Sequence, residues 1–273
     1  MDIAFRSRPA RLWFLSLSLI FSMAASPSAA PPAPARLLVS WKDFGCVVEV
    51  RGAKPMRFGL FWGVGDRHLE MFWRDDGASF RSRPSKFDFF AEPGHVRLGT
   101  AIFRSNPLPH GYWASELDLS FLDRLEGSTA MSVEAKGKRP VEVPMSDAGA
   151  AIAELRSCND SALRRFGVDP AALAALRQLP KSLAGGASAW IRPKDYPKRA
   201  LRERRVGVSL ALLTVGTDGR VVDCTIVRAS GSQDLDAAAC ILLKDRGRFE
   251  PAVGPDGMAA SAPIFVTAIW RIG

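Results

Sequence analysis

The stretch that decides the fold is residues 206–227, which read VGVSLALLTVGTDGRVVDCTIV. Two apolar runs, 206–215 and 221–227, flank the sequence Thr217-Asp218-Gly219, and Asp-Gly between alternating apolar residues is a strong hairpin signal. Side chains alternate between the two faces of a strand. The first run therefore places its larger apolar residues on one face, which is built for burial: Val206, Val208, Leu210 and Leu212.

A helix and a third strand are expected after this hairpin. The helix begins near Asp234, and the last strand runs from Ile264 to Ile272. If the last strand docks beside the first, the unit is α+β, with a three-stranded antiparallel sheet and packed helices. The last strand then lies at the sheet edge, where unpaired N–H and C=O groups can accept a strand from another chain. The apolar stripe of the helix consists of Leu235, Ala238, Ala239 and Leu242.

Five short motifs carry a family resemblance. Together, in this order and spacing, they resemble the C-terminal domain of TonB energy transducers, over roughly 80 residues from Trp190 to Gly273. The motifs are Asp195-Tyr196-Pro197, Thr217-Asp218-Gly219-Arg220-Val221, Arg228-Ala229-Ser230-Gly231-Ser232, Leu235-Asp236-Ala237-Ala238 and Phe249-Glu250-Pro251-Ala252.

The resemblance implies a periplasmic protein that binds outer-membrane receptors or other envelope proteins, linked to energy-coupled transport across the outer membrane. In such domains a short extended segment of the partner adds beside the last strand. Carried over by position, the partner-binding residues of that strand are Ile264, Phe265, Val266, Thr267, Ala268, Ile269, Trp270, Arg271 and Ile272. The second contact region begins near Pro193 and contains Lys194, Asp195, Tyr196 and Pro197.

The sequence also departs from the family. A TonB transducer has a membrane anchor with a histidine used in coupling, and a long proline-rich spacer. Here the first 30 residues contain no histidine, and a folded domain is expected where the spacer would lie. Lys194 and Asp195 stand where the family often has Gln and Pro. The resemblance therefore carries over the binding fold more directly than the transmission of force or the choice of receptor.

The first 30 residues follow the plan of a secretory signal. A basic stretch with Arg6, Arg8 and Arg11 precedes an apolar run from Leu12 to Ala25, and small residues and prolines follow. The run is shorter than the roughly 20 residues that cross a bilayer as a helix. We expect cleavage between Ala24 and Ala30 and a periplasmic protein. An uncleaved inner-membrane anchor is the alternative.

Four cysteines become disulfide candidates in an oxidising compartment. Three pairings can be formed from four cysteines. If domains fold as units, the pairing that respects the domain boundary joins Cys46 to Cys158 and Cys224 to Cys240. In the second pair, strand alternation and the helix stripe place the two cysteines where a bond fastens helix to sheet.

A length of 273 residues predicts about two domains, and a composition of 47% hydrophobic and 24% charged residues is typical of a globular protein. Residues 37–158 alternate apolar clusters with turn residues, which predicts a β-rich, sandwich-like or partly closed domain. Its helices are expected at 119–125 and from Asp147, as the cap, towards Cys158. Residues 159–189 are interpreted as a linker with one short helix, and residues 190–273 as the C-terminal domain.

Seven Lys or Arg residues lie between Arg192 and Arg205, within a net charge of +9. On an exported protein this basic stretch indicates anionic envelope surfaces or acidic partners, and export argues against nucleic acid. We find no catalytic motif, no metal-ligand spacing and no signal for a cofactor or small-molecule substrate. We therefore expect a binding protein rather than an enzyme. The alternative is a ligand-binding protein whose TonB-like tail serves homodimerisation or stability.

Overall fold

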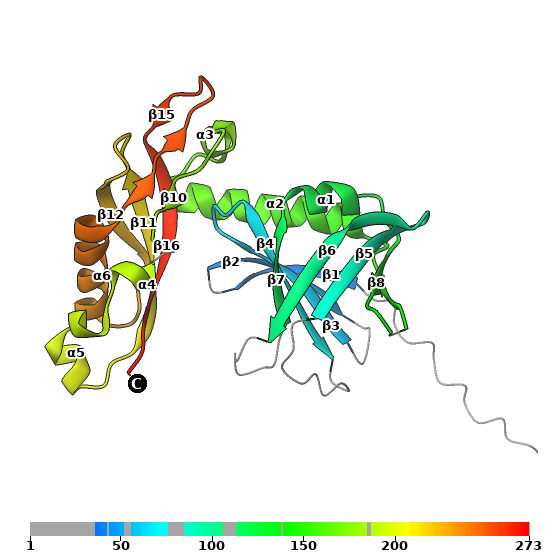
Figure 1. Ribbon diagram of the computed structural model, residues 1–273, viewed down its shortest axis with the longest axis horizontal. Helices are drawn as coiled ribbons and strands as arrows, with labels where there is room; N and C mark the ends of the chain where they lie inside the picture. Colours follow the sequence, from blue (N-terminus) through cyan, green and yellow to red (C-terminus); the bar gives the residue numbers. More distant parts are fainter. Residues whose placement is uncertain are drawn as a thin grey trace, which may run out of the picture. The chain divides into compact units, whose positions relative to one another are not determined.

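The computed structural model describes residues 36–42, 44–51, 56–75, 85–105, 113–137, 139–184 and 187–272. The predicted leader, residues 1–30, lies outside this description. Within the described residues, no helix has both the length and the apolar character needed to cross a membrane. The chain is mixed α+β, as predicted (Figure 1).

The first part of the chain folds into one nine-stranded antiparallel sheet. Its strand order is β1-β2-β3-β4-β7-β6-β5-β8-β9. The strands are β1 (Arg36–Lys42), β2 (Gly45–Arg51), β3 (Met56–Gly63), β4 (His68–Asp75), β5 (Ser85–Glu92), β6 (Val96–Ser105), β7 (Trp113–Asp118), β8 (Ala130–Glu134) and β9 (Val141–Pro144).

Two helices cover this sheet, α1 (Ser120–Leu125) and α2 (Ala148–Arg165). Phe58, Met71 and Phe89 from the strands share one buried core with Phe121 of α1 and Leu155 of α2. Of the two expected arrangements, sandwich-like or partly closed, the strands do not form two facing sheets: they form one sheet, and helices cover its buried face. Alternation in a strand shows that one face is buried but does not show whether a sheet or a helix covers it.

A disulfide between Cys46 and Cys158 ties β2 to α2, with 6.1 Å between the Cα atoms. This confirms the predicted pairing. The bond closes a loop of 112 residues, and the chain-entropy model assigns such a loop about 5 kcal/mol of stabilisation. The helix does not end there, because α2 continues to Arg165, beyond the residue where the first domain was expected to stop.

Asp147 occupies the N-cap position of α2, as expected, but its side chain makes no capping bond. Its Oδ2 accepts a hydrogen bond from the Leu37 N–H at 3.3 Å instead. The segment after α2 contains the short helix α3 (Pro170–Ala175) and the strand β10 (Lys181–Ser182), which pairs with β13 (Phe249–Glu250). Part of the predicted linker is therefore attached to the C-terminal part of the chain.

The C-terminal part contains a three-stranded antiparallel sheet in the order β12-β11-β16. A tight turn at Gly219 joins β11 to β12, with φ at +76°, and a Cβ there would lie 2.1 Å from the Phe249 carbonyl oxygen. Only glycine fits this position. The elements are α4 (Ala187–Trp190), the 3-10 helix η1 (Pro193–Asp195), α5 (Lys198–Arg202), β11 (Gly207–Val215), β12 (Val221–Arg228), α6 (Gln233–Arg246), β14 (Ala252–Val253), β15 (Ala259–Ala260) and β16 (Ala262–Trp270).

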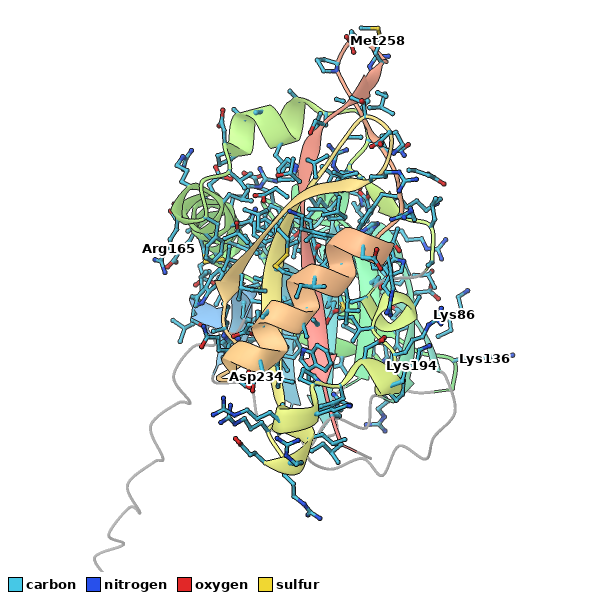
Figure 2. The ribbon with its side chains drawn as sticks, turned by 90° about the vertical axis from the view of Figure 1, so that its left-hand side faces the viewer. Lys86, Lys136, Arg165, Lys194, Asp234 and Met258 are labelled. Atoms are coloured by element: carbon cyan, nitrogen blue, oxygen red, sulfur yellow. A yellow bond between two sulfur atoms is a disulfide. The ribbon has the colours of Figure 1, made fainter. Side chains whose placement is uncertain are left out.

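Both faces of β11 carry buried side chains, whereas the sequence predicted that only one face is buried. Helix α6 lies across the strands (Figure 2) and packs on the face that carries the small residues Ser209 and Ala211. Leu210, on the other face, is buried in a cluster with Val64 and Leu163 from the preceding part of the chain. A disulfide between Cys224 of β12 and Cys240 of α6 confirms the second predicted pairing.

Candidate partner-binding edge and groove

The edge strand β16 is the first component of the site. It pairs with β11 along its whole length, from Ala262 opposite Val215 to Trp270 opposite Gly207. No other strand of the described residues pairs with β16. In an antiparallel edge strand, alternate residues direct their N–H and C=O groups away from the sheet. The outer side of β16 therefore offers main-chain donors and acceptors.

The side chains of β16 divide into buried and exposed sets. Ile264 and Val266 pack partly against the core beneath α6, and Ala268 and Trp270 are buried at the end of the strand. Phe265 packs on the opposite face, in the cluster around Leu210. Among the predicted partner-binding residues 264–272, four have exposed side chains: Thr267, Ile269, Arg271 and Ile272. The last two follow the end of the strand.

The second predicted contact region lies next to the end of β16. The Tyr196 ring meets the Trp270 ring edge-on, with 5.3 Å between the centroids. The Tyr196 hydroxyl donates a hydrogen bond to the Arg205 carbonyl oxygen. These contacts bring two segments more than 60 residues apart in sequence to one place. Pro197, immediately after Tyr196, is the N-cap residue of α5.

Asp195 has a structural partner in this arrangement. Its carboxylate accepts hydrogen bonds from Arg246 Nη1 at 2.6 Å and from Arg246 Nη2 at 3.0 Å. It also accepts the Arg192 N–H at 2.9 Å. The hydrogen bonds from Arg246, and then the one from Arg192, lower the pKa of Asp195 to about 2. A partner could use this carboxylate only by competing with Arg246, whereas the neighbouring Lys194 is exposed.

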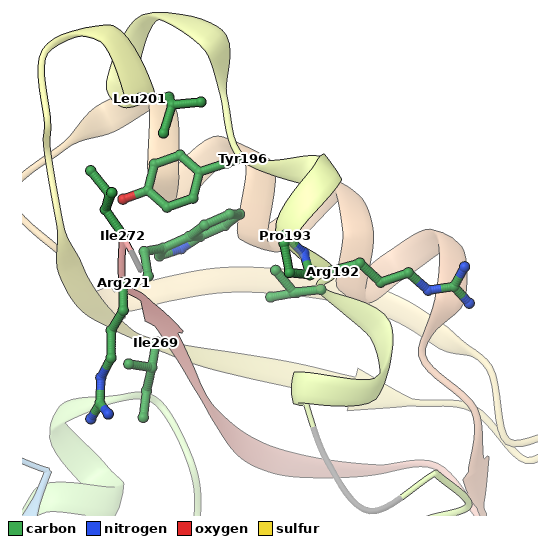
Figure 3. A pocket seen from close by; sticks show the side chains of 9 residues that line it. Arg192, Pro193, Tyr196, Leu201, Ile269, Arg271 and Ile272 are labelled. Atoms are coloured by element: carbon green, nitrogen blue, oxygen red, sulfur yellow. The ribbon is translucent and has the colours of Figure 1, made fainter.

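A groove of about 570 Å³ joins the two contact regions (Figure 3). Its apolar lining includes Leu201 and Ile269, and Arg192 and Arg271 extend away from Tyr196 in the close view. The sequence did not single out Ile191, Arg192 or Leu201 for this site. For Leu201, the available signal in the sequence was an apolar residue within the basic helix that begins at Lys198. The lining consists of Ile191, Arg192, Pro193, Tyr196, Leu201, Ile269, Trp270, Arg271 and Ile272.

The turn before α6 is stabilised by a carboxylate. The N-cap position belongs to Ser232, whose side chain makes no capping bond. Asp236 accepts hydrogen bonds from the Ser209 hydroxyl at 2.7 Å and from the Ser230 N–H at 2.9 Å. The Ser230 hydroxyl accepts the Ser232 N–H at 3.2 Å. This motif therefore holds helix α6 to strand β11.

The described residues contain no group of three or more His, Cys, Asp or Glu side chains arranged to hold a metal ion. The geometry of the C-terminal part defines a class of protein: a small α+β module with an edge strand beside an apolar groove. Residues 192–270 match the family model described as Gram-negative bacterial TonB protein C-terminal. This part of the chain is therefore a TonB C-terminal domain. A comparison of the chain with curated proteins finds no match.

Proposed function

We propose that this chain is a periplasmic TonB-like protein that binds an outer-membrane receptor or another envelope protein by strand addition at β16. The observation that carries the proposal is the outer side of β16, with which no strand of the described residues pairs. Strand addition requires a row of main-chain donors and acceptors, and it requires no catalytic residue.

The incoming segment gains affinity from the main chain and selectivity from side chains. Each new main-chain hydrogen bond contributes a net stabilisation of about 1 kcal/mol. Thr267 and Ile269 would contact alternate side chains of that segment, and the groove beside Tyr196 would receive the residues that follow. The chain would thus prefer an extended segment with apolar character towards one end.

The first part of the chain would act as a firm support for this domain. Its disulfide joins β2 to α2, and the end of α2 contributes Leu163 to the cluster that covers Leu210 and Phe265. An edge strand supported in this way keeps its geometry when a partner pulls on it. Participation in energy-coupled transport rests on the family membership of residues 192–270.

Homodimerisation is the second candidate, because the same edge of β16 could pair with its copy in another chain. Multi-angle light scattering separates the two functions. A monomer at micromolar concentration supports a heterologous partner. A concentration-dependent dimer that a proline at Val266 abolishes supports the alternative, because proline removes a donor from the strand ladder.

A pair of threonines supplies a matched test of the main proposal. Thr267 lies on β16 and Thr225 on β12, so both are exposed residues on the two outer strands of one sheet. A photo-crosslinking amino acid is placed at each position in separate strains. We expect an adduct with an outer-membrane or envelope protein from position 267 and none from position 225. Equal adducts, or none from position 267 in intact cells, would reject strand addition at β16.

A further inference from the structure

Exposed apolar side chains gather at the end of the C-terminal sheet where β11 begins and β16 ends. Leu201 of α5 is 48% exposed, and Ile269 and Ile272 are 52% and 38% exposed. All three line the same groove. Exposed aliphatic side chains that form one group indicate a contact surface, whereas single ones do not.

Basic side chains lie in the same two segments as this group. Lys198, Arg202, Arg204 and Arg271 are exposed, and none of them forms an ion pair within the part of the chain that the structure describes. Their neighbour Arg205 differs, because it pairs with both Glu203 and Asp234. The acidic groups of this region are thus already engaged by Arg199 and Arg205. The remaining cations leave an excess of positive charge around the apolar residues.

We name these seven residues the basic apolar end: Lys198, Leu201, Arg202, Arg204, Ile269, Arg271 and Ile272. In sequence they come from two segments, one around α5 and one at the end of β16. The register that places Gly207 opposite Trp270 brings both segments to the same end of the sheet. Figure 1 shows α5 and the end of β16 at the end of this domain opposite the β14–β15 hairpin.

We propose that the basic apolar end binds the surface of an anionic phospholipid bilayer. Aliphatic side chains enter the boundary between headgroups and acyl chains, and lysines and arginines are attracted to the phosphates. Four cations distributed over two segments suit a surface that carries many negative charges.

Membrane binding goes beyond strand addition, because it requires neither a donor strand nor a protein partner. It would hold the end of β16 close to a bilayer and to proteins embedded in that bilayer. Attachment to a surface raises the effective concentration of a partner on that surface. The two activities are nevertheless separable, because Lys198 and Arg202 of α5 belong to the basic apolar end but lie neither in β16 nor in the lining of the groove.

Vesicle flotation with the full chain tests the proposal. The probes are vesicles of phosphatidylcholine with 30% phosphatidylglycerol, compared with pure phosphatidylcholine. The test variant is Lys198→Gln with Arg202→Gln, and the matched control is Lys136→Gln with Arg139→Gln, which are exposed residues between β8 and β9. We expect anionic vesicles to bind the test variant roughly 30-fold more weakly than the wild type, and the control variant to bind normally.

A second variant and a local readout complete the test. Leu201→Ser with Ile272→Ser should weaken binding while preserving its dependence on salt, because the charges remain. Hydrogen exchange should slow in residues 198–204 when anionic vesicles are added, and not in residues 136–142. This local readout is independent of any binding by the N-terminal segment, which all variants share.

Equal binding by both charge variants, or exchange in residues 198–204 that anionic vesicles leave unchanged, would overturn the proposal. Slower exchange with a poly-glutamate peptide but not with vesicles would assign the basic apolar end to an acidic protein segment instead. None of these outcomes bears on the crosslink from Thr267. The failure of bilayer binding and the failure of strand addition are therefore distinguishable.

Discussion

The edge of the Tyr196 ring rests against the ring of Trp270, and the hydroxyl of the same tyrosine donates to the Arg205 carbonyl oxygen. The first contact joins the segment before α5 to the end of β16. The second joins it to the residue two positions before β11. Tyr196 thus connects both strands at the end of the sheet where the groove lies.

Replacement of Tyr196 separates these two roles. Tyr196→Phe removes only the hydrogen bond and should lower the free energy of unfolding by about 1 kcal/mol. Tyr196→Ala also removes the ring beside Trp270 and should cost roughly 3 kcal/mol. Urea unfolding followed by tryptophan fluorescence measures both. Equal losses for the two variants would contradict a stabilising role for the ring contact.

Asp195 should make the C-terminal domain sensitive to acid. Hydrogen bonds from Arg246 lower the pKa of Asp195 to about 2, from an ordinary value near 3.8. A lowered pKa contributes stability above pH 3.8, and this contribution is lost as the pH falls through about 2. Asp195→Asn should therefore reduce stability at pH 6 and flatten the loss between pH 4 and pH 2. Thermal unfolding across this range measures the effect. An acid transition that the substitution leaves unchanged would refute it.

Asp66, in the turn between β3 and β4, should have the opposite pH dependence. Desolvation, followed by repulsion from Glu70, raises its pKa to about 6. Glu70 lies directly opposite Glu116 in the sheet, and burial followed by that neighbour raises the Glu70 pKa as well. A raised pKa contributes stability below pH 3.8, and this contribution is lost as the pH rises through about 6.

Asp66→Asn tests this sign. It should raise the melting temperature at pH 8 and have little effect at pH 3.5, where the wild-type carboxyl is protonated. The Asp66 carbonyl oxygen accepts the Trp62 indole N–H at 2.7 Å, and the substitution preserves this bond because it involves the main chain. A destabilised variant at pH 8 would show that the charged carboxylate has a favourable partner.

The two disulfides should differ in their contributions. Chain entropy predicts about 5 kcal/mol for the bond between Cys46 and Cys158 and about 3 kcal/mol for that between Cys224 and Cys240, because the loops span 112 and 16 residues. Paired alanine variants measured in urea test the order.

The intact mass of protein taken from the envelope should show removal of the leader and the loss of about four hydrogens. A mass that includes residues 1–30 would favour the uncleaved anchor.

The local features of the C-terminal part were readable from the sequence, and the long-range ones were not. Asp218 and Gly219 specify a turn through backbone geometry that only neighbouring residues determine. The two disulfides followed from the order of the domains. By contrast, the second buried face of β11 depends on Leu163, which is 47 residues away from Leu210 in the sequence. The groove also depends on two segments that are far apart in the sequence, because Leu201 and Ile269 line it together. Helix α2 was expected to run from Asp147 towards Cys158, and it continues to Arg165. Its last turns contain Ala162 and Leu163, which are buried against residues distant in the sequence.

Ile269 and Val222 provide the last prediction, because they are comparably exposed aliphatic residues on the two outer strands of one sheet. Ile269 on β16 is 52% exposed, and Val222 on β12 is 56% exposed. A strand added to β16 would bury the carboxylate that Ile269→Asp introduces. Because a buried carboxylate without a partner is costly, this substitution should lower the yield of the photo-crosslinked adduct from position 267 at least about tenfold. Val222→Asp places the same charge on the far edge of the same sheet, so it should change solubility and net charge equally and leave the adduct intact. Since both variants keep the β11 pairing of their strands, unfolding in urea should be similar for the two. A loss of adduct in both variants would mean that charge, rather than occupation of the β16 edge, controls the association.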